Sequence, residues 1–153
     1  MLLIMLLMAA HLIAAVFWVG GIAFAYTVLR PAAGALDPAV RLPLWRRVFA
    51  RFLPWVGLSI VALLVSGFAM SFLIFGNLAS APPYVHAMAT SGIIMMLLYL
   101  YLVVAPWRRF CNALDHGALP EAAKNLNQMR IIVGINLILG ALTIIIGGTG
   151  RYW

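Results

Sequence analysis

The sequence predicts an all-α membrane protein, a single domain over residues 1–153 that crosses the bilayer as a four-transmembrane-helix bundle. Three observations predict this fold class. Hydrophobic residues make up 66% of the chain and charged residues 8%, whereas a soluble domain is about half apolar and about a quarter charged. Four apolar segments are each long enough to cross a hydrocarbon core of roughly 30 Å. The cations between those segments are concentrated in two of the three connections.

The first span is expected to end at Arg30-Pro31, because a proline following an arginine closes the apolar run. That run is too long for a secretory signal and has no basic residues before it, so it is expected to be a retained helix. The third span is expected to end at Pro106, and the fourth to fray into its glycines. The four predicted spans are residues 2–29, 52–75, 84–105 and 131–148.

Basic residues predict the topology. The connection between spans two and three, residues 76–83, contains no cation. Connections one and three carry nearly all of them: Arg30, Arg41, Arg46, Arg47 and Arg51 in the first, and Arg108, Arg109, Lys124 and Arg130 in the third. Because positively charged loops stay inside, both termini are expected on the periplasmic side of a bacterial cytoplasmic (inner) membrane. Within the first connection, Pro43 is expected to open a short interfacial helix.

Several function classes are excluded by what the chain contains. The net charge of +7 is explained by topology and predicts no nucleic-acid partner, because no basic stripe with interleaved aromatics is present. The single cysteine, Cys111, excludes an internal disulfide and a CxxC site. The sequence has no nucleophile–base pair, no carboxylate pair and no phosphate loop, which excludes soluble-type hydrolysis and ATP chemistry. The lipid bilayer is the one certain partner.

Two histidines lie at the same predicted depth. His11 precedes Arg30 by 19 residues and His86 precedes Pro106 by 20, so at about 1.5 Å per residue each lies about 30 Å from the inner boundary. Ionisable side chains inside a span are costly and usually functional. The sequence therefore predicts a site near the outer face, between helices one and three.

The leading hypothesis is a b-type cytochrome that binds haem b between these histidines. Neutral imidazole is the usual axial ligand of haem iron, and small side chains one turn after each histidine leave space for a flat macrocycle. Haem carries two negatively charged propionates, and Arg151, 21 residues beyond Arg130, is expected at the same outer level as the histidines. With two histidine ligands the protein would transfer electrons between a periplasmic or membrane partner and an acceptor such as quinone. With a single histidine ligand and an open iron site, the protein would be a haem-dependent oxidoreductase. The predicted site comprises His11, His86, Ala15, Trp18, Thr90 and Arg151.

Two alternatives remain open from the residues. Met70 and Met88 lie near the same outer level as the histidines, and thioethers with imidazole suit copper(I), which would make the chain a copper-binding or copper-transport protein. Alternatively, the histidines are structural and hydrogen-bond across helices, as in an assembly protein without chemistry of its own. A homodimer with a close-contact face at Gly20-Gly21, or at Gly134 and Gly140, is also expected.

Several short motifs resemble the copper-resistance protein D (CopD) family of bacterial inner-membrane proteins. They are the stretch from His11 through Trp18 to Gly20-Gly21, Arg51-Phe-Leu, Ser66-Gly67, Pro83-Tyr-Val-His86, and Asn127-Gln-Met-Arg130 followed by Gly140. The resemblance implies a copper-related membrane protein. The layout is more distantly similar to HemJ-type protoporphyrinogen oxidases, a family that binds haem b and in which a histidine in helix one and a Leu-His-x-Lys pattern in helix three are functional. Met88 stands where that pattern has lysine, which departs from the oxidase.

Overall fold

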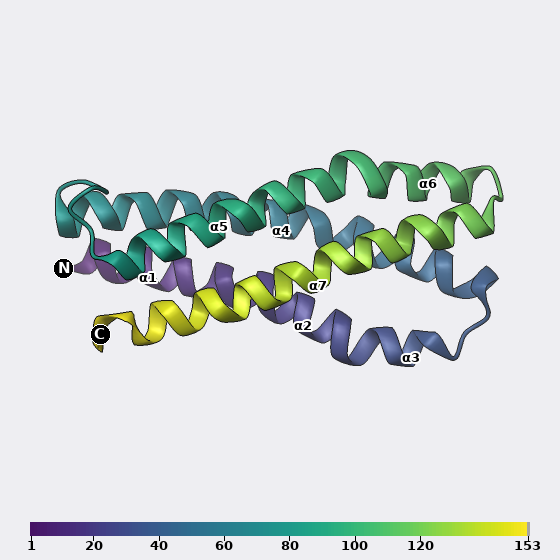
Figure 1. Ribbon diagram of the computed structural model, residues 1–153, viewed down its shortest axis with the longest axis horizontal. Helices are drawn as coiled ribbons and strands as arrows, with labels where there is room; N and C mark the ends of the chain where they lie inside the picture. Colours follow the sequence, from purple (N-terminus) through teal and green to yellow (C-terminus); the bar gives the residue numbers. More distant parts are fainter. Residues whose placement is uncertain (153) are drawn as a thin grey trace.

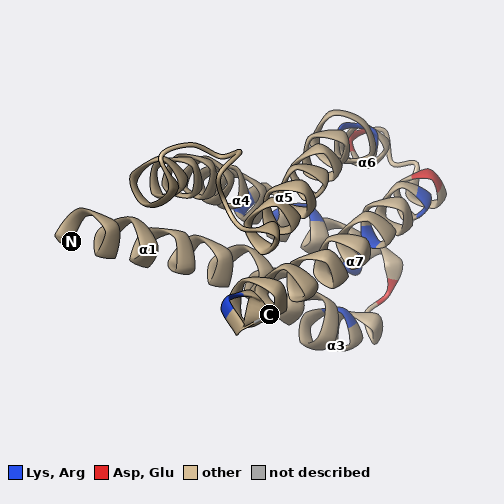
Figure 2. Cartoon of the chain, turned by 60° about the vertical axis from the view of Figure 1, so that its left-hand side comes forward, with Lys and Arg blue, Asp and Glu red and all other residues tan. Residues whose placement is uncertain are grey.

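The computed structural model describes residues 1–152, and throughout that range the chain is helical or in turns. Four segments are long and apolar enough to cross a membrane: Leu2–Gly34, Pro38–Phe75, Pro83–Asp115 and Leu119–Tyr152. They run up and down as a bundle, with both chain ends at one end of it (Figure 1). We call the end with the two chain termini the terminal end. Most lysines and arginines lie at the opposite end (Figure 2), which we call the basic end. The predicted fold class of four membrane-spanning helices is confirmed.

Two of the four segments contain π-helical turns. The first consists of α1 (Leu2–Ala15), η1 (Val16–Gly20), α2 (Gly21–Phe24), η2 (Ala25–Leu29) and α3 (Arg30–Gly34). The second is the single helix α4 (Pro38–Phe75). The third consists of α5 (Pro83–Leu102), η3 (Val103–Trp107) and α6 (Arg108–Asp115), and the fourth of α7 (Leu119–Thr149) and the 3₁₀ turn η4 (Gly150–Tyr152).

Prolines do not end or open the helices as predicted. The first helix continues through Pro31 to Gly34, Pro43 lies inside α4 instead of opening a separate interfacial helix, and the third continues through Pro106 to Asp115. Proline lacks an N–H and its ring crowds the preceding turn, and two of these three prolines lie in or near a π-helical turn. Pro106 lies within η3, and Pro31 is the second residue of α3, which follows η2. The helices therefore extend beyond the predicted apolar spans.

The turn between α6 and α7 is shaped by a glycine and a proline. Gly117 takes a positive φ of 68°, which glycine adopts without the steric cost of a Cβ, and Pro120 lies in the first turn of α7, where its missing N–H is not needed. Arg46 of α4 forms an ion pair with Asp115 beside this turn. Both side chains are about half exposed, so the pair contributes little to stability.

Large buried side chains are concentrated at the basic end and in the middle of the bundle. At the basic end Phe110, Met129 and Ala122 are fully buried, and the middle contains a second cluster of Trp18, Ile22, Val56 and Met95. Toward the terminal end the buried side chains of α1 and α4 include Ala14, Ser66 and Ser71. In this part of the molecule α1 packs mainly on α4, and α5 packs mainly on α7.

Most glycines of the expected dimer face make contacts within the chain. A Cβ at Gly21 would lie 2.5 Å from the Phe52 ring, and one at Gly134 would lie 3.3 Å from the Tyr26 ring. A Cβ at Gly140 would lie 2.7 Å from Val19 Cγ2. Only Gly20 has nothing within 4 Å. The face predicted from Gly21, Gly134 and Gly140 is thus used for packing inside the bundle, because close helix approach needs small residues there. A homodimer stays a prediction.

Candidate metal site at His11

The imidazole of His11 faces α4 and is hydrogen-bonded to it. Its Nδ1 lies 2.8 Å from Ser66 Oγ, and Ser66 Oγ in turn lies 2.5 Å from the carbonyl oxygen of Ala62, one turn earlier on α4. A serine hydroxyl has a single hydrogen to donate, and Ala62 accepts it. His11 Nδ1–H must therefore donate to Ser66, an assignment that rests on the hydrogen-bond network.

This tautomer leaves the lone pair of His11 on Nε2. Within residues 1–152 the hydrogen-bond partners of this ring are Ser66 Oγ and the backbone carbonyl of Leu63. Histidines that bind metals commonly donate their other ring N–H to a fixed acceptor, which sets the tautomer and the orientation of the ring. Ser66 supplies that acceptor here, so His11 is prepared to coordinate a metal through Nε2.

Gly67 gives the imidazole its space. A Cβ at this position would lie 3.2 Å from His11 Cε1, closer than nearly all real Cβ contacts, so even alanine would push on the ring. The adjacent residues Ser66 and Gly67 therefore have separate roles toward one imidazole: the first binds Nδ1 and the second makes room for the ring. Sequence reasoning missed this pairing, because His11 and Ser66 lie 55 positions apart and no spacing rule connects two helices.

Two methionines lie one turn from this site. Met70 is four residues after Ser66, hence on the same face of α4, and is buried. Met8 is three residues before His11 on α1. Because α1 and α4 run in opposite directions (Figure 1), both methionines lie toward the terminal end from the hydrogen-bonded pair. Each methionine thus lies one turn from the His11–Ser66 pair along its own helix, and Met70 is buried whereas Met8 is exposed.

His11 and His86 have different immediate surroundings. The His11 ring lies against Ser66 and Gly67 of α4, whereas His86 and Thr90 lie on an exposed side of α5. The physical reason is helix pairing: α1 packs on α4 while α5 packs on α7. The predicted haem between helices one and three is therefore not supported.

The other predicted site residues have different surroundings. Trp18 is buried in the middle cluster, Ala15 is half-buried on α1, and Arg151 lies over the ring of Tyr152 at 5.0 Å in the last turn. Met88 packs against α7, since a Cβ at Gly147 would meet its Cε at 2.8 Å. Among the residues from 1 to 152, no three His, Cys, Asp or Glu side chains cluster.

Four long apolar helices define this chain as a multi-pass membrane protein. The sequence model of the family described as copper resistance protein D (CopD) matches residues 46–149, about two thirds of the chain. This protein belongs to the CopD family, as the short motifs indicated. No curated protein and no solved structure was found to match it, and the likeness to HemJ-type oxidases is not shown.

The family match includes part of the candidate site. It begins at Arg46 in α4 and so covers Ser66, Met70 and His86, but not His11. The α4 half of the site lies in the region that defines the family, and the histidine is added by α1. Its role rests on the geometry described above.

Proposed function

We propose that this protein binds copper(I) as its cargo within the membrane, through His11 Nε2 and the thioether of Met70. The observation that carries the proposal is the hydrogen bond between His11 Nδ1 and Ser66 Oγ, which leaves the Nε2 lone pair for a metal, with the buried Met70 one turn further along α4. Membership of the copper resistance protein D family makes copper the metal to expect.

The ligand chemistry favours the reduced ion. Thioether and imidazole are soft and borderline ligands that select copper(I), whereas magnesium, calcium and manganese prefer carboxylate, carbonyl and water oxygens. His11 and Met70 are both neutral ligands and lie on facing helices that pack on one another. Met8, one turn from His11 on α1, is a third potential ligand.

The site lies toward the terminal end of the bundle. With arginine-rich connections in the cytoplasm, this end faces the periplasm of a bacterial inner membrane. Copper(I) would then reach His11 from the outer side of the membrane. The periplasmic orientation of the terminal end is thus part of the proposed function.

An anaerobic titration of the purified wild-type protein with copper(I), against a chromophoric copper(I) chelator, tests the function. We expect one copper(I) per chain and no Soret band in the dithionite-reduced spectrum. Failure to compete for copper(I) in a folded preparation would overturn the proposal. Stoichiometric haem with a low-spin reduced spectrum would overturn it in favour of the cytochrome.

Ser66→Ala tests the positioning role of the hydroxyl. Without an acceptor on Nδ1 the imidazole loses its fixed orientation and tautomer, and loss of such a partner typically lowers metal affinity by roughly 10- to 100-fold. We expect copper(I) affinity to fall by about tenfold in the chelator competition assay. Ser59→Ala is the matched control, because Ser59 is buried on the same helix and its hydroxyl donates only to the Trp55 carbonyl. Equal losses in the two variants would contradict a specific role for Ser66.

A further inference from the structure

A large groove opens near the basic end of the bundle, away from the His11 site. It lies between the π-helical part of the first segment, the start of α4 and the middle of α7, with a volume of about 700 Å³. Much of its wall is aromatic and aliphatic, including Phe17, Phe24, Trp45, Phe49 and Phe52. Such an apolar wall is chemically suited to a hydrocarbon chain.

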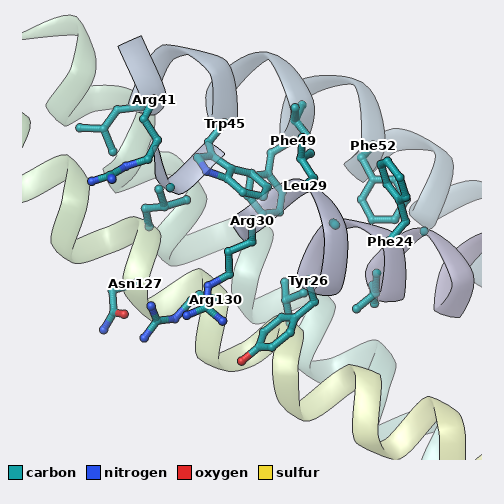
Figure 3. A pocket seen from close by; sticks show the side chains of 18 of the residues that line it. Phe24, Tyr26, Leu29, Arg30, Arg41, Trp45, Phe49, Phe52, Asn127 and Arg130 are labelled. Atoms are coloured by element: carbon teal, nitrogen blue, oxygen red, sulfur yellow. The ribbon is translucent and has the colours of Figure 1, made fainter. Parts of the chain in front are cut away.

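Three arginines line one end of the groove. Figure 3 shows Arg30, Arg41 and Arg130 toward one side, with Asn127 beside them and Phe24 and Phe52 toward the other. These arginines come from three different helices: α3, α4 and α7. Chain folding, and not a local run of sequence, therefore concentrates the positive charge.

No carboxylate of the described residues forms an ion pair with these three arginines. Over residues 1–152 the single ion pair joins Arg46 to Asp115, which do not line the groove. Arg30 lies over the Tyr26 ring at 5.0 Å, a contact that orients the guanidinium while leaving its donors available. The groove therefore has unbalanced positive charge at one end and an apolar surface at the other.

We propose that this groove binds one anionic phospholipid, with its phosphate among the three arginines and an acyl chain along the aromatic wall. The dimensions agree. Val16 and Arg30, near the two ends of the groove, are separated by about 21 Å of helix, and one leaflet including its headgroup layer is about 20 Å thick. Basic pockets between membrane helices on the cytoplasmic side are known to hold anionic headgroups.

Native mass spectrometry of the full-length protein in micelles with equal amounts of phosphatidylglycerol and phosphatidylcholine tests this site. We expect the wild type to retain one phosphatidylglycerol in preference to phosphatidylcholine by at least tenfold. Arg30→Gln with Arg130→Gln should remove most of that preference. Arg108→Gln with Arg109→Gln, which removes two exposed cations from the same end of the molecule, should keep it. Equal losses in both pairs, or no preference in the wild type, would overturn the proposal.

A second variant separates a lipid from a free anion. Ala25→Phe places a bulky ring in the groove while all three arginines remain, and we expect it to reduce phosphatidylglycerol retention at least fivefold in protein of unchanged thermal stability. Undiminished retention, or displacement of the lipid by equimolar inorganic phosphate, would show a simple anion site and overturn the lipid assignment. A quinone or porphyrin mass in the groove would overturn it as well.

Discussion

Replacing His11 with alanine is expected to lower copper(I) affinity by more than about 100-fold, whereas His86→Ala changes it by less than about twofold. His11 supplies the proposed nitrogen ligand itself, so its loss should exceed the 10- to 100-fold effect of removing an outer partner. His86 lies on an exposed side of α5, and its helix packs mainly on α7. Chelator competition on both purified variants measures the difference.

This pair of variants also distinguishes the two metal hypotheses. A haem ligated by both histidines would lose its low-spin spectrum in either variant, with no difference between them. Comparable loss of copper from His11→Ala and His86→Ala would contradict the site described above. His11→Gln, which keeps a polar side chain facing Ser66, provides a check that the loss of affinity comes from the imidazole and not from disrupted packing of α1 on α4.

The largest effect on stability is expected from Gly140→Val in α7. A Cβ at this position would lie 2.7 Å from Val19 Cγ2 and 3.2 Å from Met95 Cε, so the first and third membrane segments both approach α7 here. Inserting bulk into such a contact typically costs about 1–3 kcal/mol, and a β-branched side chain facing another one has few rotamers that relieve it. We expect a loss near 3 kcal/mol, measured by equilibrium unfolding in mixed detergent micelles.

Gly148→Val is the matched control. This variant also replaces a glycine of α7 by valine, but a Cβ at Gly148 would meet nothing within 4 Å. Any change in helix propensity between glycine and valine is common to both variants. If Gly148→Val destabilised the protein as much as Gly140→Val, the close approach of three segments at Gly140 would not be the cause.

The sequence predicts the position of a residue along the helix axis, but not its direction around that axis. His11 and His86 were placed at one level by counting residues from the basic boundaries, since helical rise is constant. Which way each ring points depends on which helices pair, and that follows from packing over the whole length of α1, α4, α5 and α7. The haem hypothesis needed both depth and direction, and the direction of His86 does not favour it.

For the four helices, the sequence likewise predicted the number of crossings but not where each helix ends. The apolar runs predicted the number of crossings, because the thickness of the hydrocarbon core sets their minimum length. They did not predict that the helices would continue through Pro31 and Pro106, since π-helical turns before or around these prolines depend on local backbone geometry. The first helix and α4, each longer than its predicted span, provide Arg30 and Arg41 at the basic end.

The amino-acid sequence by itself determined the four crossings, the separation of charge between the two ends of the bundle, and the family motifs. These features depend on composition and on order along the chain, which the bilayer selects for directly. The tertiary structure alone decided that Ser66 fixes the His11 tautomer, that His86 is exposed, and that arginines from three helices line one groove. Those features depend on which helix faces are brought together, and that is set by side-chain packing between segments far apart in sequence.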